Sequence, residues 1–211
     1  MLDDAFQHRK IRAGFYVLLT SYSKLFTKDW LLPAGNLRES ASGAQRANTV
    51  IVTKCPSNIS DSEKKSIKQQ LKLKSYQSLY FSTVDYASPV SEDDDFDFNK
   101  PFVLVTGIAD SSQLVQYLEE KGKQFTHLNY SDHHNFSEAD KKVILQKAVD
   151  LGYQILTTEK DFQRLNTNLF KDSCVPFGYL PISVRIIDDS NRFSSEIINF
   201  VEGFFAEKTE G

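Results

Sequence analysis

The chain has 211 residues, 40% of them hydrophobic, and a formal net charge of −3, a composition that suits a globular protein with one or two buried cores. Its two cysteines, Cys55 and Cys174, lie far apart, which argues against a disulfide framework or a cysteine-based zinc cluster and favours a reducing cytoplasmic setting. No apolar run approaches the roughly 20 residues that span a bilayer, and the first residues form no signal peptide, so any membrane association is expected to be peripheral or to reside in sequence outside this chain.

Charge is distributed unevenly along the chain. Residues 1–84 contain 13 Lys/Arg against 6 Asp/Glu, whereas the remainder contains 12 against 22. A basic first part could face phosphates or an anionic membrane surface, or it could be a solvated helix face, and the sequence leaves both interpretations open.

Short apolar runs bounded by turn residues predict strands, with helical patterns between several of them. The expected strands are Phe15–Thr20, Thr49–Lys54, Ser78–Thr83, Phe102–Thr106, Gln124–Tyr130, Tyr153–Thr157, Val175–Leu180 and Ile182–Ile187. Because strands and helices alternate, we expect an α/β fold with a largely parallel sheet.

Capping residues mark where the helices begin. Ser60 with Glu63 reads as a capping box that opens a helix to about Leu73, and Ser137 precedes a second helix. That second helix carries Ala139, Val143, Ile144, Ala148 and Leu151, and a terminal helix is expected at Ser194–Phe205.

The acidic tract at residues 91–97 is too charged to pack, so it predicts a loop or a domain junction. We therefore expect one domain or domain remnant at residues 1–90 and a C-terminal α/β domain at residues 91–211.

Two adjacent acids follow the stub of an apolar strand at the start of the chain. In nucleotide-dependent phosphoryl transfer, carboxylates at the carboxyl end of a buried strand hold or orient the magnesium that neutralises charge on the transferring phosphate. Asp3 and Asp4 are placed for that role, although the pair alone could equally cap or solvate a terminus.

Three later segments carry polar groups at turns or at the ends of predicted strands. In the loop Leu31–Glu39, Arg38 and Glu39 offer an anion fork and an acceptor. Asp132-His133-His134 and Thr157-Thr158-Glu159-Lys160-Asp161 each follow a strand, where open α/β sheets place their sites. Each segment alone could be a surface turn, a capped loop or a plain helix start.

The residues of these segments and the order of the segments along the chain resemble those of tetraacyldisaccharide 4′-kinase, the lipid A 4′-kinase family. The resemblance rests on Asp3-Asp4-Ala5-Phe6-Gln7-His8-Arg9, Leu32-Pro33-Ala34-Gly35 with Leu37-Arg38-Glu39, Asp132-His133-His134 and Thr157-Thr158-Glu159-Lys160-Asp161. It covers nearly the whole chain. The sequence departs from the family pattern at Ala5, Asn36, Ser40 and Ser131, changes that affect loop stiffness more than chemistry.

The resemblance implies an enzyme that uses ATP and Mg²⁺ to phosphorylate the 4′-hydroxyl of a lipid A disaccharide precursor at the cytoplasmic face of the bacterial inner membrane, with no nucleic-acid partner. It assigns Asp3 and Asp4 to the magnesium cluster, with His8 nearby. His133 would partner the base and lie within about 12 Å of Asp4 in one cleft.

The remaining assignments are to the edges of the site. Arg38, Glu39 and His134 would line the substrate or nucleotide cleft, and Glu159 with Lys160 would shape the face between domains.

The sequence contains no Gly-x-x-x-x-Gly-Lys-Ser/Thr loop, whereas the family carries one upstream of its Asp-Asp motif. The chain is therefore expected to be a fragment, or a gene prediction begun at an internal Met, with a truncated P-loop-type first domain and a complete C-terminal α/β domain. The missing part would also carry the base and the membrane anchor.

Two other functions stay open: a metal-dependent phosphoesterase suggested by Asp132-His133-His134, and a non-catalytic partner domain.

We predict that the purified 211-residue chain has no kinase activity, because a Gly-rich loop and its Lys are needed to cradle the β- and γ-phosphates. The measurement is phosphate transfer from ATP to a tetraacyl disaccharide 1-phosphate in the presence of Mg²⁺. Transfer by this chain alone would refute the prediction.

Overall fold

Two compact units make up the protein, and the computed structural model describes residues 2–8, 10–92, 95–165, 168–187 and 189–209. One unit is formed by Met1–Val84 with Val184–Gly211, and the other by Asp85–Ser183. The sequence-based division grouped residues 91–211, whereas in the structure the last 28 of these residues belong with the first unit. The chain thus leaves the first unit and returns to it, which a reading of local sequence does not reveal.

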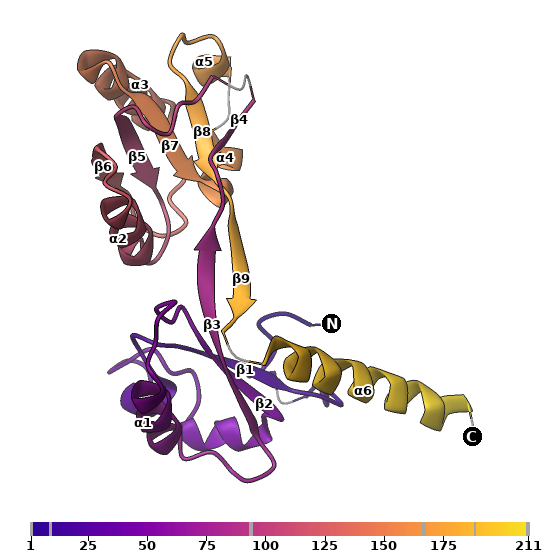
Figure 1. Cartoon of the computed structure of the whole chain (residues 1–211). Helices are drawn as coiled ribbons and strands as arrows, with labels where there is room; N and C mark the ends of the chain where they lie inside the picture. The colour runs from indigo at the N-terminus through magenta and orange to yellow at the C-terminus, as the bar shows by residue number, and fades with distance from the viewer. Residues whose placement is uncertain (1, 9, 93–94, 166–167, 188, 210–211) are drawn as a thin grey trace. The chain divides into compact units, whose positions relative to one another are not determined.

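The first unit is built on a four-stranded sheet with the order β1 (Val17–Ser21), β2 (Thr49–Thr53), β3 (Ser78–Tyr86) and β9 (Ile182–Ile186) (Figure 1). The β1–β2 and β2–β3 pairs are parallel. Helix α1 (Asp61–Leu71) and the 3-10 segments η1 (Phe26–Lys28) and η2 (Ala41–Arg46) lie in the connections between these strands.

The two faces of this sheet are covered by different helices. Val50 and Val52 of β2 are fully buried in one cluster with Ile67 and Leu71 of α1. The other covering helix is α6 (Ser190–Thr209). Its Phe193 packs against Tyr80 of β3, with the two ring centroids 5.1 Å apart. Glu196 of α6 then accepts hydrogen bonds from the Tyr80 hydroxyl at 2.7 Å and the Thr49 hydroxyl at 2.5 Å. These bonds explain why the carboxyl-terminal helix joins the first unit.

The second unit contains a five-stranded sheet in the order β4 (Val90–Ser91), β8 (Phe177–Leu180), β7 (Gln154–Thr158), β5 (Phe102–Thr106) and β6 (Phe125–Asn129). All its pairs are parallel except β4–β8. Its helices are α2 (Ser112–Glu120), α3 (Glu138–Leu151), α4 (Glu159–Leu165) and α5 (Asn168–Lys171). The expected α/β class with largely parallel sheets is confirmed.

Strand β5 is buried on both faces, as its continuous apolar sequence predicts. Phe102 and Leu104 pack in a cluster with α2, whereas Val103 and Val105 pack in a cluster with α3. The sheet is thus the middle layer of three. The carboxyl ends of β5, β6 and β7 meet at one edge, so the loops that follow them lie close together.

The predicted helix starts are confirmed at both capping boxes. The Ser60 hydroxyl accepts from the backbone of Glu63, and Ser137 does the same with Asp140. Helix α3 ends at Gly152, whose φ of 65° is the left-handed conformation typical of a helix end. In the acidic tract, Ser91 lies in β4, while Asp93 and Asp94 lie outside the described residues.

Among the helices that the structure describes, none combines the length and the apolar character required to cross a bilayer.

Adjacent positions on α3 give a test of its packing. Ile144 is fully buried, whereas Val143 is 60% exposed. We expect Ile144→Ala to lower the free energy of unfolding by about 2–5 kcal/mol, because it removes buried methyl groups and leaves a cavity. Val143→Ala should change it by no more than about 0.5 kcal/mol. Urea denaturation followed by far-UV circular dichroism measures the free energy of unfolding of both variants, and equal effects would contradict the assigned helix face.

Candidate functional site

The opening acidic pair lies on the surface of the first unit. Asp3 and Asp4 are exposed, and the Asp3 carboxylate accepts a hydrogen bond at 2.9 Å from the backbone N–H of Asp4, whose φ is 46°. Arg38, 34 residues away in sequence, places its Nη1 3.5 Å from Asp4 Oδ2. Both side chains are more than half exposed, so this ion pair is weak and leaves the carboxylates accessible. His8 is also exposed on this unit.

The loop containing Pro33 and Gly35 is organised by Asp29, a residue that the sequence analysis did not single out. Its carboxylate accepts from the backbone N–H groups of Trp30 at 2.9 Å and Asn36 at 3.3 Å. Partial burial raises the pKa of Asp29, but these bonds and Lys24 outweigh it and hold the pKa below its usual value. A Cβ at Gly35 would collide with the backbone of Trp30, so only glycine fits this turn.

Glu39, expected to line a cleft, makes a bidentate ion pair with Arg46. The two N–O distances are 2.8 and 3.1 Å. Arg46 also donates to the carbonyl of Phe6 at 2.8 Å and stacks over that ring at 4.7 Å. The bond to Glu39 raises the pKa of Arg46 above its usual value, against the effect of burial. This clamp ties the segment after Asp3-Asp4 to η2.

A metal ion would find few protein ligands here. Within the described part of the chain, no three His, Cys, Asp or Glu side chains gather in a way that could hold a metal. Asp3 and Asp4 supply two accessible carboxylates. Mg²⁺ typically takes one or two carboxylates and fills its remaining positions with water and phosphate oxygens, so this pair fits magnesium bound together with a phosphate substrate.

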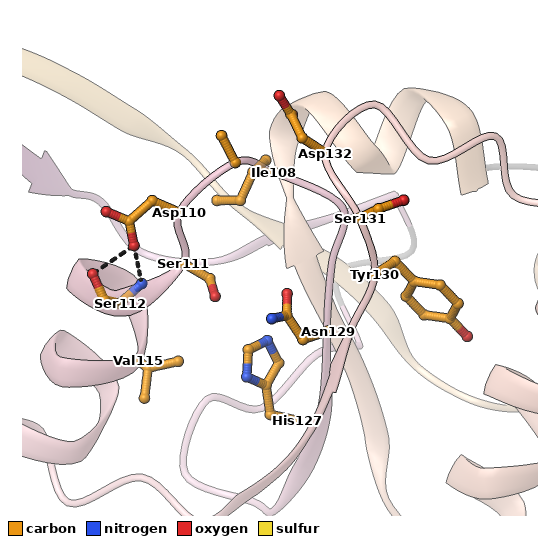
Figure 2. Close-up of a pocket in the computed structure, with 11 residues that line it drawn as sticks. Ile108, Asp110, Ser111, Ser112, Val115, His127, Asn129, Tyr130, Ser131 and Asp132 are labelled. Atoms are coloured by element: carbon orange, nitrogen blue, oxygen red, sulfur yellow. Dashed lines mark hydrogen bonds between the residues drawn. The ribbon is translucent and has the colours of Figure 1, made fainter. Parts of the chain in front are cut away.

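In the second unit, a pocket of about 480 Å³ opens at the carboxyl edge of the sheet. Figure 2 shows His127 and Asn129 of β6 opposite Ser111 and Val115 at the start of α2. The Thr106 hydroxyl lies 2.8 Å from His127 Nε2 and 3.0 Å from Asn129 Oδ1, so it fixes both side chains. Burial lowers the pKa of His127, which favours the neutral imidazole.

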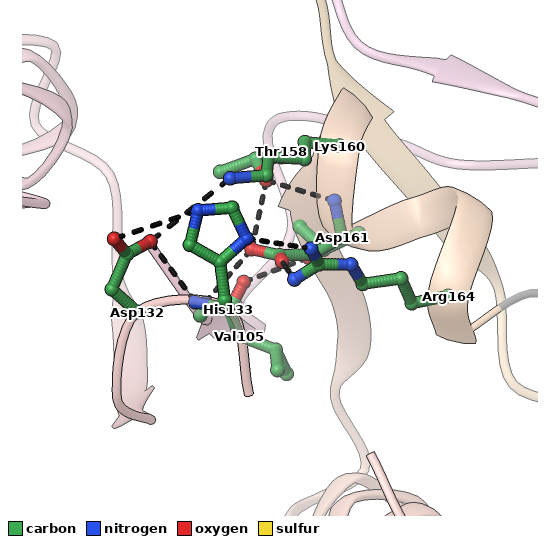
Figure 3. A network of polar contacts seen from close by, with 9 residues as sticks. Val105, Asp132, His133, Thr158, Lys160, Asp161 and Arg164 are labelled. Carbon is green, nitrogen blue, oxygen red and sulfur yellow. Dashed lines mark hydrogen bonds and ion pairs between the residues drawn. The ribbon is translucent and has the colours of Figure 1, made fainter. Parts of the chain in front are cut away.

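Asp132 stands at the rim of this pocket and connects it to His133 and Lys160 (Figure 3). Its carboxylate lies 3.8 Å from His133 Nε2 and 4.0 Å from Lys160 Nζ. The His133 side chain is 69% exposed, and its φ of 56° is left-handed. Its backbone N–H donates to Gly107 O and to the Asp132 carboxylate. Glu159 is exposed at the start of α4.

His134 has a different environment from its neighbour. Its Nε2 lies 3.2 Å from Asp140 Oδ2, inside the capping box of α3. Its ring also packs against Tyr130 and Phe136, at centroid distances of 4.7 and 5.0 Å. Contacts of this kind hold the loop onto the helix start, so His134 serves the structure of the loop and His133 is left facing outward.

Asp161 and Arg164 of α4 were not predicted as site residues, yet they lie beside His133. Asp161 is completely buried, and its Oδ2 accepts from Gly107 N at 2.8 Å and from the Thr158 hydroxyl at 2.9 Å. The Thr-x-x-Asp spacing from Thr158 is a helix-start pattern that could have indicated the bond to Thr158. The bond to Gly107, 54 residues away, had no local signal.

The predicted residues fall into two groups, one in each unit. Asp3, Asp4, Arg38 and Glu39 lie in the first unit, and Asp132, His133, His134, Glu159 and Lys160 lie in the second. The expected proximity of Asp4 and His133 joins residues of different units, so it stays a prediction.

Residues 1–202 match the family described as tetraacyldisaccharide-1-P 4′-kinase, LpxK. Relatives named tetraacyldisaccharide 4′-kinase include proteins from Flavobacterium johnsoniae, 41% identical over 209 residues, and Phocaeicola vulgatus, 38% identical over 215 residues. These alignments cover 96% and 95% of this chain and 59% of each relative. The chain therefore spans less than two thirds of the length of these relatives.

A solved structure with a similar fold is LpxK from Aquifex aeolicus, described as an "apo" form in complex with ATP. Its TM-score is 0.62 at 21% identity, and the superposition covers 94% of this chain and 56% of that one. At this identity the likeness concerns the fold. The family match over residues 1–202 establishes that this chain belongs to the tetraacyldisaccharide-1-P 4′-kinase family.

Proposed function

We propose that this chain forms part of an ATP-dependent kinase that phosphorylates the 4′-hydroxyl of the tetraacyl disaccharide 1-phosphate precursor of lipid A. Its membership of the family over residues 1–202 is the observation that carries the proposal. The accessible carboxylates of Asp3 and Asp4, and the outward-facing ring of His133, supply the chemistry such a reaction needs.

The role proposed for Asp3 and Asp4 is to hold Mg²⁺. When bound, the ion neutralises charge on the phosphate that is transferred. The Asp3 carboxylate accepts from the Asp4 backbone N–H at 2.9 Å, and Asp4 forms a weak, exposed ion pair with Arg38 at 3.5 Å, which an ion could replace. Arg38 would then turn toward a phosphate or substrate oxygen, and the exposed His8 is proposed to orient the pair.

His133 is proposed to orient the carboxylate base that takes the proton from the 4′-hydroxyl. An imidazole N–H that bonds to a base fixes the direction of its lone pairs and stabilises the transition state. The flanking residues support this arrangement in two ways. Within the second unit, Lys160 lies 4.0 Å from Asp132, and Glu159 is proposed to add a negative charge beside Lys160; in the first unit, Glu39 separately holds its own loop through Arg46.

The proposed setting is the cytoplasmic face of the bacterial inner membrane. The substrate carries acyl chains, so the enzyme has to work at a lipid surface, and we propose a peripheral contact made through sequence outside this chain. A nucleic-acid partner is not part of the proposal.

A metal-dependent phosphoesterase is the weaker alternative. Such enzymes hold two metals with several Asp and His ligands. Among the described residues, the His134 ring contacts Asp140, the His133 ring contacts Arg164, and Lys160 pairs with Asp132; the two cations Arg164 and Lys160 disfavour a metal here. A non-catalytic partner domain would need a separate chain to supply the nucleotide chemistry, and a loss of turnover on substitution of His133 would distinguish an enzyme from it.

We predict that His133→Ala lowers turnover by about 10²–10⁴ with little change in ATP affinity, because orientation of a base matters most in the transition state. The measurement is steady-state kinetics of a chimera that joins this chain to the remaining length of the Flavobacterium johnsoniae relative. A normal turnover with a raised Michaelis constant for ATP would instead make His133 a nucleotide contact.

His134→Ala is the matched comparison in the same chimera. It removes the bond to Asp140 and the ring contacts, so it should lower thermal stability and reduce turnover less than His133→Ala. Equal losses of turnover from both substitutions would contradict the different roles given to the two histidines.

A further inference from the structure

The ring of His133 is exposed, and few contacts fix its direction. Its Nδ1 lies 3.3 Å from Arg164 Nη2, and its Nε2 lies 3.8 Å from Asp132 Oδ2. The first distance is that of a hydrogen bond, whereas the second is too long for one. Arg164 is therefore the side chain that holds the ring by a direct bond.

Arg164 is itself held by an ion pair with the buried carboxylate of Asp161. Its Nη1 lies 3.5 Å from Asp161 Oδ1. Both of these atoms are buried, and neither makes a hydrogen bond within the described part of the chain, so the ion pair is the contact that compensates each of them. The other oxygen of Asp161 is occupied by Gly107 and Thr158. The carboxylate cannot turn without breaking those bonds, so the guanidinium keeps its place.

The bond between Arg164 and His133 has only one possible direction. A guanidinium is always protonated and donates only, so Nδ1 of His133 has to be the acceptor and cannot carry a proton. The neutral ring is then the Nε2–H tautomer. Its single N–H is directed toward Asp132 and the solvent.

We propose that Arg164, anchored by Asp161, is a positioning residue that fixes His133 as the Nε2–H tautomer and aims that N–H outward (Figure 3). This inference rests on the proposed function for its catalytic meaning, because the N–H aimed outward is the one that would orient the base. The tautomer itself is a property of this chain and can be measured without any kinase activity.

The first experiment is nitrogen-15 NMR of the intact chain labelled at histidine, at a pH well above the range in which histidine titrates. The chain has four histidines, and His133→Gln identifies the signal of interest by its loss. We expect His133 to show only the Nε2–H pattern. In Arg164→Met and in Asp161→Asn it should become an exchanging mixture of both tautomers, whereas Arg164→Lys, which keeps a donor, should restore part of the preference.

Internal signals report whether each variant folds. His127 is fixed by Thr106 and His134 by Asp140, so both should keep their chemical shifts in a folded variant. Lys171→Met removes another partly exposed cation of the same unit, paired with Glu92, and should leave His133 unchanged. If a folded Arg164→Met variant keeps the native tautomer pattern, or if the native ring carries its proton on Nδ1, the proposal is overturned.

The second experiment links the tautomer to turnover in the chimera. Arg164→Met should lower kcat by roughly 10-fold with an unchanged KM for ATP, and it should add no further loss in the His133→Ala background. Full additivity of the two losses would contradict action through His133. An inactive chimera would count against the proposed function alone, since the NMR result stands independently.

Discussion

A carboxylate buried away from water requires hydrogen-bond donors or cations around it. Asp161 is such a carboxylate, and it lies at the carboxyl edge of the sheet in the second unit. Gly107 supplies a backbone N–H from the end of β5, Thr158 supplies a hydroxyl from the end of β7, and Arg164 supplies a charge from α4. Three segments of the edge are thereby fixed around one group. The carbonyl of Gly107 in turn accepts from the backbone of His133, so the loop after β6 is tied to the same point.

The first unit uses an ion pair for a similar purpose, but it leaves its acids exposed. Arg46 joins Glu39 to the carbonyl and ring of Phe6, which fixes the backbone just after Asp3 and Asp4. The two acids themselves are exposed, and the ion pair of Asp4 with Arg38 is weak and solvated. Rigid support next to accessible carboxylates supports the proposed role of the two acids in holding an ion, because the protein then loses few internal contacts on binding.

The sequence predicted much of the local structure, because strands and helix caps depend on patterns within a few residues, and it predicted the family from short motifs in a fixed order. The apolar run at 102–106 is β5 to the residue, and the capping boxes at Ser60 and Ser137 open α1 and α3. Helix α2, whose Ser111 makes no side-chain cap, was not predicted. Bonds between distant segments were also missed: Glu196 to Thr49, Asp161 to Gly107 and Arg164 to His133 join residues 147, 54 and 31 positions apart. Such pairs follow from topology, which no window of sequence contains.

Adjacent histidines show why the candidate site required the structure. His133 and His134 have the same chemistry and follow the same strand, so their different roles had to come from the contacts around them. The backbone of His133 is left-handed, which turns its side chain away from the direction taken by His134. His134 can then reach Asp140 and the rings of Tyr130 and Phe136, while His133 meets Arg164. A left-handed residue without a glycine's freedom carries strain, and the hydrogen bonds that its backbone N–H donates to the Gly107 carbonyl and the Asp132 carboxylate offset it. The same edge that buries Asp161 therefore selects which histidine faces outward.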